Sequence, residues 1–313
     1  MREQQRFLAA IAAILGVAFA LAPAPARAED DSRSVGGGKC AENAFNCIGA
    51  ANPLSPATTP WIDRMTWMDV RDAIARGKRT VIIPAGGLDP NGPWITLDKH
   101  DRIVATMCES IAAALGDALC APVIPFVSES GAKPDAPEGF ARTPGALYIS
   151  EGAYEALLAD IAAGLKAHGF SSIVMIGDHG GDVDGMQAVA ARLTAQWHGA
   201  PAVVYIPEFY QSYDGAVELL YAKGLGKRGV TDGLHDDPTV TLMMMLSDPE
   251  SVRWKERVKL GKASIDGVSI ADLAQAQAWG RELVDYRTRV TVDAIRKALA
   301  PAAGGTAAAP AKH

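Results

Sequence analysis

Helical and extended hydrophobic patterns alternate along the chain from Trp61 onward. Apolar residues that recur every three or four positions predict helices, and short continuous apolar runs predict strands. Such alternation with near-continuous apolar strands is typical of an α/β fold in which helices cover both faces of a mostly parallel sheet. The predicted helices span 65–77, 101–116, 151–168, 183–198 and about 269–298, and the predicted strands span 80–86, 118–127, 171–177 and 202–209.

The start of the chain has the pattern of an export signal. A short basic stretch precedes an apolar run at 7–22, and Ala26-Arg27-Ala28 is a small-x-small cleavage site. The apolar run is shorter than the roughly 20 residues that span a bilayer, which favours a cleaved signal over a membrane anchor. We therefore expect a periplasmic or secreted protein without membrane association after cleavage. Its expected segments are a signal peptide at 1–28, a flexible segment at 29–56, a folded domain at 57–300 and a disordered tail at 301–313.

The four cysteines fall into two pairs. Export would place them in an oxidising compartment, where Cys40 and Cys47 are close enough in a loop-like segment to form a disulfide. Cys108 lies inside a helical pattern, and Cys120 lies at the start of a strand-like run. We expect this second pair to be buried apolar thiols.

Composition and charge narrow the class of ligand. The chain has 313 residues, of which 49% are hydrophobic and 21% charged, so it can bury a large core. Its net charge is -6 and it has no cluster of lysine and arginine, which argues against a nucleic-acid partner. A small molecule is the expected ligand.

Two predicted strands run directly into glycine-containing turns that carry acidic, amide and imidazole side chains. Because the carboxyl ends of parallel strands meet at one edge of a sheet, these side chains can approach one another. Neutral imidazoles with a carboxylate bind zinc, manganese or iron, and such an ion activates a water for hydrolysis. The side chains are Asp89, Asn91 and His100 after the strand at 80–86, and Asp178, His179 and Asp182 after the strand at 171–177.

A third candidate segment surrounds His235, which is followed by Asp236 and Asp237. This segment also has the composition of a solvated acidic loop. The aspartates and the asparagine of the two glycine turns have a second interpretation too, because such residues often cap helices. Three of the six histidines end helices or lie in the tail, which leaves His100, His179 and His235 as the functional set.

The order of these motifs resembles the creatininase family of metal-dependent amidohydrolases, over roughly residues 57–298. PAGGLDPNGPWITL stands in the place of the family's P-x-G-S-x-E-Q-H-G-P-H-x-P-L, and HGFSSIVMIGDHGGD stands in the place of GF…NGHGGN. TWMDVRDAI, PGALYIS and His235 occur in the matching order. The resemblance implies a three-layer α/β/α sandwich, a small-molecule amide substrate and a homo-oligomer, commonly a hexamer in the family.

The resemblance also implies roles for single residues. Asp89 takes the place of a metal-binding glutamate, and His179 that of the histidine in NGHGG. His235 matches a later histidine expected to shuttle protons. Two positions depart from the family pattern: Asn91 stands where the family has a ligating histidine, and His100 where it has an aspartate that bridges two metals.

These departures favour one metal ion, because an imidazole seldom bridges two ions. We predict a single ion, Zn²⁺ or else manganese or iron, held by Asp89, His100 and His179 with a water in the open position. In the alternative, Asp182 or Asp237 supplies the missing carboxylate of a rearranged two-metal site. The residues expected to contact substrate or to support the ligands are Asn91, Trp94, Asp178, Asp182, Asp236 and Asp237.

The predicted reaction is cleavage of a C–N bond in a cyclic or linear amide by metal-activated water, with His235 passing a proton to the leaving nitrogen. Creatinine is not expected, since the family's creatinine-specific members sandwich that ring with tryptophans and residues 205–234 contain none. The alternatives are a non-catalytic metal- or ligand-binding protein on the same fold and a lactone or ester hydrolase.

Overall fold

The structure is a computed structural model that describes residues 33, 34, 36–129, 133–229 and 235–300. The expected signal peptide at 1–28 and the expected tail at 301–313 lie outside these ranges. The chain divides into two compact units, Met1–Ser55 and Pro56–His313. Among the described helices, none is long and apolar enough to cross a membrane.

In the first unit, a disulfide joins Cys40 to Cys47, with 5.5 Å between their Cα atoms. This confirms the predicted pairing. A 3-10 helix, η1 (Ala44–Asn46), lies between the two cysteines, and the side chain of Asn43 caps it by accepting the Phe45 N–H. Ser34 forms an antiparallel bridge with Cys47.

The second unit is built on a parallel sheet of four strands in the order β2-β1-β3-β4. The strands are β1 (Thr80–Ala85), β2 (Ala118–Cys120), β3 (Ser172–Gly177) and β4 (Ala202–Tyr205). All six residues of β1 are buried. The continuous apolar run of β1 is therefore explained by burial on both faces, as the sequence predicted.

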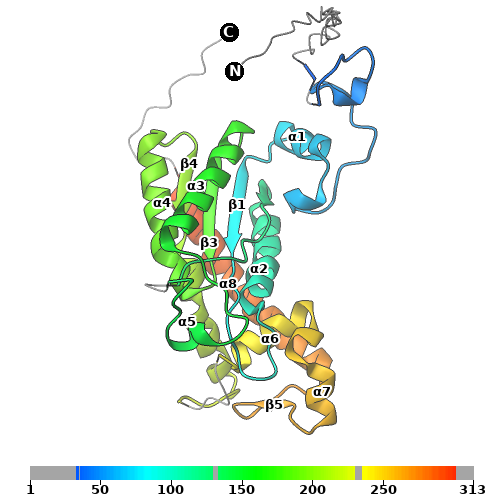
Figure 1. The fold of residues 1–313 in the computed structure, drawn as a ribbon. Helices are drawn as coiled ribbons and strands as arrows, with labels where there is room; N and C mark the ends of the chain where they lie inside the picture. The colour runs from blue at the N-terminus through cyan, green and yellow to red at the C-terminus, as the bar shows by residue number, and fades with distance from the viewer. Residues whose placement is uncertain (1–32, 35, 130–132, 230–234, 301–313) are drawn as a thin grey trace, which may run out of the picture. The chain divides into compact units, whose positions relative to one another are not determined.

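Side chains that alternate along the strands pack into two separate cores. Ile82 and Val174 face one core, and Val81 and Ile173 face the other. Helices therefore cover both faces of the sheet, and Figure 1 shows α3 and α4 on the side opposite α8. The first face carries α2 (Lys99–Leu115), α5 (Pro207–Ala222), α6 (Pro238–Ser247) and α8 (Leu273–Leu299); the second carries α1 (Trp67–Ala75), α3 (Glu151–Ala167) and α4 (Val183–Gln196).

Local sequence explains where several helices begin. Thr66 and Asp69 form a capping box at α1, and the Ser150 hydroxyl accepts the Ala153 N–H at α3. Pro207 and Pro238 occupy the first turns of α5 and α6, where proline's fixed φ is already helical. The smaller described elements are α7 (Trp254–Lys259), the hairpin of β5 (Ser264–Ile265) and β6 (Val268–Ser269), and the 3-10 helices η2 (Ile62–Arg64), η3 (Gly139–Arg142), η4 (Gly180–Asp182) and η5 (Pro249–Val252).

Two predicted strands are too long. The run at 118–127 forms a strand only as far as Cys120, and the run at 202–209 ends as a strand at Tyr205. Prolines interrupt both runs, at Pro122 and Pro207, and a proline cannot donate to the sheet ladder. The second run instead enters α5, a helix that the sequence analysis did not predict.

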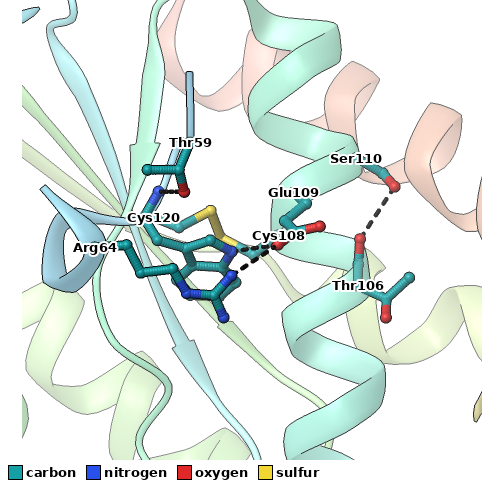
Figure 2. Close-up of a disulfide and its surroundings, with 8 residues drawn as sticks. Thr59, Arg64, Thr106, Cys108, Glu109, Ser110 and Cys120 are labelled. Atoms are coloured by element: carbon teal, nitrogen blue, oxygen red, sulfur yellow. Dashed lines mark hydrogen bonds and ion pairs between the residues drawn. A yellow bond between two sulfur atoms is a disulfide. The ribbon is translucent and has the colours of Figure 1, made fainter. Parts of the chain in front are cut away.

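The prediction of free thiols at Cys108 and Cys120 is wrong. These residues are fully buried, as expected, but they form a disulfide with 6.2 Å between their Cα atoms. The bond ties α2 to β2 beside the Thr59 and Arg64 segment (Figure 2). Helix α2 packs directly against β2 in the folded sheet, a proximity that hydrophobic periodicity does not encode.

Candidate metal centre

The candidate site lies at the carboxyl ends of β1 and β3. Gly86 brings the loop after β1 against α2, since a Cβ there would lie 2.0 Å from Oδ1 of Asp101. The neighbouring Gly87 has a φ of 135°, and its N–H donates to the same oxygen at 2.9 Å. This close approach places Asp89 beside His100 of α2.

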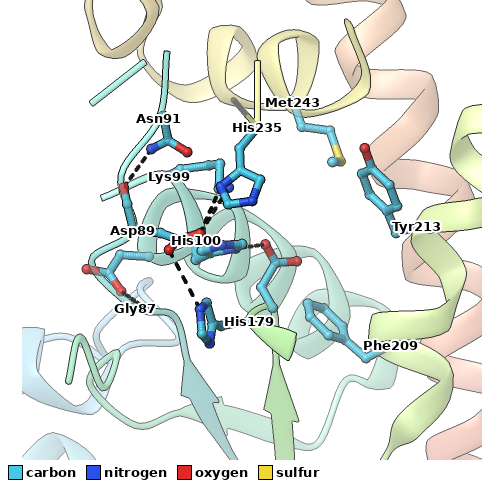
Figure 3. Close-up of polar contacts among 12 residues, drawn as sticks. Gly87, Asp89, Asn91, Lys99, His100, His179, Phe209, Tyr213, His235 and Met243 are labelled. Atoms are coloured by element: carbon cyan, nitrogen blue, oxygen red, sulfur yellow. Dashed lines mark hydrogen bonds and ion pairs between the residues drawn. The ribbon is translucent and has the colours of Figure 1, made fainter. Parts of the chain in front are cut away.

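The structure brings together Asp89, His100 and His179, one ligand atom from each lying within 4.8 Å of the others. Nε2 of His100 is 3.3 Å from Oδ2 of Asp89, and Nε2 of His179 is 3.8 Å from Oδ1. Asp89 and His179 are buried. Figure 3 shows Lys99, His100, His179 and His235 pointing toward the Asp89 carboxylate. The three residues predicted as metal ligands thus form a compact N/O cluster.

The carboxylate of Asp178 and the guanidinium of Arg287 fix the orientation of His100. Nδ1 of His100 is 2.9 Å from Oδ2 of Asp178, whose other oxygen accepts from Nη2 of Arg287 at 3.0 Å. Burial alone would raise the pKa of Asp178, but Arg287 and the bond to His100 hold it below its usual range. The carboxylate therefore accepts Nδ1–H, and in the neutral form of the ring the Nε2 lone pair faces Asp89.

The facing atoms of His100 and Asp89 suit a cation between them. An acceptor nitrogen of His100 that faces an acceptor oxygen of Asp89 at 3.3 Å is repulsive unless a proton or a metal ion lies between them. One carboxylate with two imidazoles is also a donor set that zinc accepts. The residues present therefore fit a divalent ion.

Asp89 is the centre of the cluster. Besides the two histidines, it contacts the hydroxyl of Tyr148 at 2.6 Å, Nζ of Lys99 at 3.5 Å and Nδ1 of His235 at 3.1 Å. Burial would raise its pKa, but the surrounding histidines and the Tyr148 hydroxyl outweigh that effect and hold the pKa well below its usual range. Asp89 is consequently ionised, as a metal ligand must be.

His179 has a second carboxylate neighbour. Its Nδ1 accepts the N–H of Gly181 at 3.1 Å, and its Nε2 is 3.2 Å from Oε2 of Glu129. With Nδ1 accepting a hydrogen bond, a neutral ring carries its proton on Nε2. To hold an ion through Nε2, the ring would carry that proton on Nδ1 instead.

His235 and Asp237, also predicted for the site, line a cavity that opens over the cluster. Nδ1 of His235 lies 3.2 Å from the carbonyl oxygen of Pro90 as well as close to Asp89. Asp237 caps α6 by accepting the N–H groups of Thr239 and Val240. Burial raises the pKa of Asp237.

Three other predicted residues do not reach the cavity. Asp182 is fully buried, and its carboxylate packs so closely on Gly177 that a Cβ added to that glycine would lie 2.3 Å from Oδ1 of Asp182. Burial raises the pKa of Asp182 well above its usual range. Asp236 forms a buried ion pair with Arg257 at 2.7 Å. The guanidinium of Arg257 also lies over the ring of Trp94, with its Cζ 5.4 Å from the ring centroid. None of these three side chains is among the described residues that line the cavity over the cluster, although Asp236 lines a neighbouring cavity, so their roles at the site stay predictions.

Asn91 supports the loop that carries Asp89. Its amide nitrogen donates to the carbonyl oxygens of Asp89 at 2.9 Å and of Thr96 at 3.0 Å. Three residues that were not predicted for the site contact the cluster: Lys99, Glu129 and Tyr148. A fourth, Arg287, contacts Asp178. Tyr148 lies in the motif PGALYIS and Lys99 is next to His100, whereas Glu129 and Arg287 carried no local signal.

A cavity of about 560 Å³ opens over the cluster, and we call it the metal-site cavity. A neighbouring cavity of about 590 Å³ shares four lining residues with it. Those shared residues are Tyr213, Asp214, His235 and Asp237. The space beside the cluster is therefore larger than the first cavity alone.

Comparison with known proteins identifies the family. The family model for creatininase, described as creatinine amidohydrolase, matches residues 63–294. The chain belongs to the creatininase family. Members of the creatininase family are hydrolytic enzymes, so the prediction of a hydrolase is confirmed, and with it the predicted family and α/β sandwich.

Individual relatives agree with this assignment. The chain is 33% identical over 119 residues to the mycofactocin precursor peptide peptidase of Mycolicibacterium smegmatis, a match that covers 36% of this chain and 44% of the peptidase. The chain thus spans less than half of that creatininase-family relative. A crystal structure of creatinine amidohydrolase has a TM-score of 0.56 at 17% identity, covering 79% of this chain and 100% of that one. A creatininase mutant of Zn-Zn type also has a TM-score of 0.56, at 18% identity over 78% of this chain and 100% of that one.

Proposed function

We propose that the protein is a metal-dependent amidohydrolase that cleaves a C–N bond of an amide. The observation that carries this proposal is the cluster of Asp89, His100 and His179, whose ligand atoms lie within 4.8 Å of one another at a cavity. These three residues would hold one divalent ion, which we propose to be zinc, with manganese or iron as alternatives. When bound, such an ion supplies Lewis acidity and lowers the pKa of a water.

The chain's own residues supply orientation and proton transfer. Asp178 holds the His100 ring through Nδ1, and Arg287 holds Asp178. His235 donates from Nδ1 to Asp89 and the Pro90 carbonyl, and its imidazole is the group that we propose exchanges a proton with substrate. A proton taken up by this imidazole can then pass to the leaving nitrogen.

We propose a linear amide, such as a peptide bond, as the substrate. The metal-site cavity and its neighbour share lining residues, which gives room for groups on both sides of the scissile bond. Tyr210 and Tyr213 line the metal-site cavity, and no tryptophan is among its described lining residues, which disfavours a creatinine sandwich. The peptidase relative supports this choice.

We also propose that the protein is exported and forms a homo-oligomer. The two disulfides support export, because such bonds persist in oxidising compartments. The oligomer, a hexamer by resemblance to the family, would be measured by light scattering of the purified protein.

The test combines metal analysis with a substrate screen. We expect the purified protein to contain a divalent metal and to hydrolyse linear amides, with activity lost in chelator and restored by zinc. His179→Ala should lose metal and activity, while the control His168→Ala, at an exposed helix end, should keep both. Full activity and full metal content in His179→Ala would remove the case for this site, and preferential cleavage of lactones or cyclic amides would change the substrate class.

A further inference from the structure

Lys99 is a buried cation inside the metal-site cavity that the proposed reaction does not use. It is the first residue of α2, next to His100, and only 3% of its surface is exposed. Lysines are almost never this buried unless they are paired. Burial lowers the pKa of Lys99, while the nearby carboxylates of Asp89, Asp178 and Asp237 act in the opposite direction.

Lys99 differs from the structural ion pairs of the same domain. Arg257 contacts Asp236 at 2.7 Å, and Asp236 gives both of its oxygens to that one guanidinium. Nζ of Lys99 is 3.5 Å from Oδ2 of Asp89. Asp89 is at the same time shared among three histidines and Tyr148. Lys99 therefore shares the Asp89 carboxylate with several other side chains and does not form an isolated ion pair with it.

Two of the carboxylates around the cavity are already engaged by other groups of the protein. Asp178 is engaged by Arg287 and His100, and Asp237 by Tyr213 and the first turn of α6. Two ions about 4 Å apart need a bridging carboxylate and enough negative charge to offset their repulsion. Asp89 could bridge, but Lys99 already lies beside its Oδ2.

The formal charge of the cavity also disfavours a second divalent ion. Among the described residues that line the cavity, five carboxylates against two cations give a formal charge of −3, with every carboxylate counted as ionised and the histidines as neutral. One divalent ion brings this to −1, and a second would make the centre positive. Without the ammonium, two divalent ions would leave it neutral. The carboxylates are Asp89, Glu129, Asp178, Asp214 and Asp237, and the cations are Lys99 and Arg287.

We infer that Lys99 is a fixed cation of the centre that restricts it to one divalent metal ion. Its ammonium lies 3.5 Å from the carboxylate that would have to bridge two ions, and it supplies positive charge that a second ion would otherwise bring. This inference rests on the proposed metal centre but concerns its stoichiometry and affinity. Lys99 is thus a determinant of metal content that acts through Asp89.

Metal binding to the whole purified protein tests the inference without any substrate. After removal of metal with chelator, Zn²⁺ would be titrated by calorimetry and the bound metal counted after gel filtration. We expect one equivalent in the wild type. Lys99→Met, which keeps length but removes charge, should bind that ion about tenfold more tightly or better. Lys99→Arg should bind it with close to wild-type affinity, as should Lys259→Met, which removes an exposed charge outside the cavity.

The outcomes separate the inference from the proposed function. Two equivalents in the wild type, or unchanged or weaker binding in Lys99→Met, would overturn the role of Lys99 while leaving a metal-dependent hydrolase intact. No zinc bound to the wild type would instead remove the proposed metal centre. Lys99→Gln, checked for folding by circular dichroism, serves if the methionine variant does not fold, and the wild-type stoichiometry needs no variant at all.

Discussion

Asp178 and Arg287 form a buried ion pair, with Nη2 of Arg287 3.0 Å from Oδ1 of Asp178. The guanidinium also donates to Oγ of Ser212 and to the carbonyl oxygen of Phe209. Only 1% of Arg287 is exposed, so all of its bonds are to the protein interior. Through Asp178, this pair connects α8 to the ring of His100, one of the proposed metal ligands.

Removing the arginine should damage both stability and the site. Arg287→Met leaves the Asp178 carboxylate buried without its cation, which typically costs about 3–5 kcal/mol. The free energy of unfolding by urea should fall by that order, and zinc affinity should fall because His100 is less well oriented. Arg289→Met, on the exposed side of α8, is the control. The double variant Arg287→Met with Asp178→Asn should recover part of the stability, and no recovery would show that the two side chains are not coupled.

His235 should matter for turnover and not for metal content. His235→Gln cannot carry a proton on an imidazole, so kcat on a substrate found by the screen should fall by about 10²–10⁴-fold. The metal content of the purified variant should match the wild type, because the ligand cluster does not include His235. A variant that loses its metal would show that His235 is a ligand, and one with unchanged kcat would end its role in proton transfer.

The sheet and its central strands were predictable because burial on both faces requires continuous apolar runs such as 80–85 and 172–177. Strand ends were less predictable, since Pro207 allows both the end of a strand and the start of a helix. The helix α5 shows which of the two the fold selects, because Phe209 and Leu220 on that helix pack into the core.

Site residues were predictable where the strand ends converge, as at Asp89 and His179. Asp182 follows the same strand as His179 but turns back against Gly177, a packing detail that spacing does not encode. Arg287 was not predictable, since it lies 109 residues from Asp178 in the sequence and meets it only through the packing of α8. The burial of Lys99 likewise depends on neighbours from several elements.

Asp101 should make the stability of the metal-free protein depend on pH. Burial raises its pKa from the ordinary 3.8 to about 6. The folded state therefore holds this proton more tightly than the unfolded state, and the resulting stability is lost as pH rises from about 4 to about 6. Asp101→Asn retains an acceptor for the Gly87 N–H without ionising. The variant should gain up to about 2 kcal/mol relative to wild type between pH 4 and 7, allowing for solvent screening, and a pH-independent difference would contradict this.

The disulfide between Cys108 and Cys120 should stabilise the second unit. It closes a loop with a sequence separation of 12, for which chain entropy gives about 3 kcal/mol. The double variant Cys108→Ala with Cys120→Ala should have a correspondingly lower Tm, measured by calorimetry. Reductant should lower the wild-type Tm toward that value, and any remaining effect of reductant on the double variant reports the Cys40–Cys47 bond. Equal Tm values for the oxidised wild type and the double variant would mean that the bond adds no stability.

Gly86 should tolerate no side chain, because it sets the distance between the loop after β1 and α2. A Cβ at this position would lie 2.6 Å from the backbone nitrogen of Asp101 and 2.7 Å from its Cα, so Gly86→Ala must push α2 away from the sheet edge. We expect a loss of about 2 kcal/mol or more in stability and weaker zinc binding, since His100 moves with α2. Gly164→Ala in α3, where a Cβ meets nothing within 4 Å, should be neutral or more stable by up to about 1 kcal/mol. Because both variants add one methyl group, comparable stability and zinc affinity in the two would show that the close approach at Gly86 does not position the metal centre.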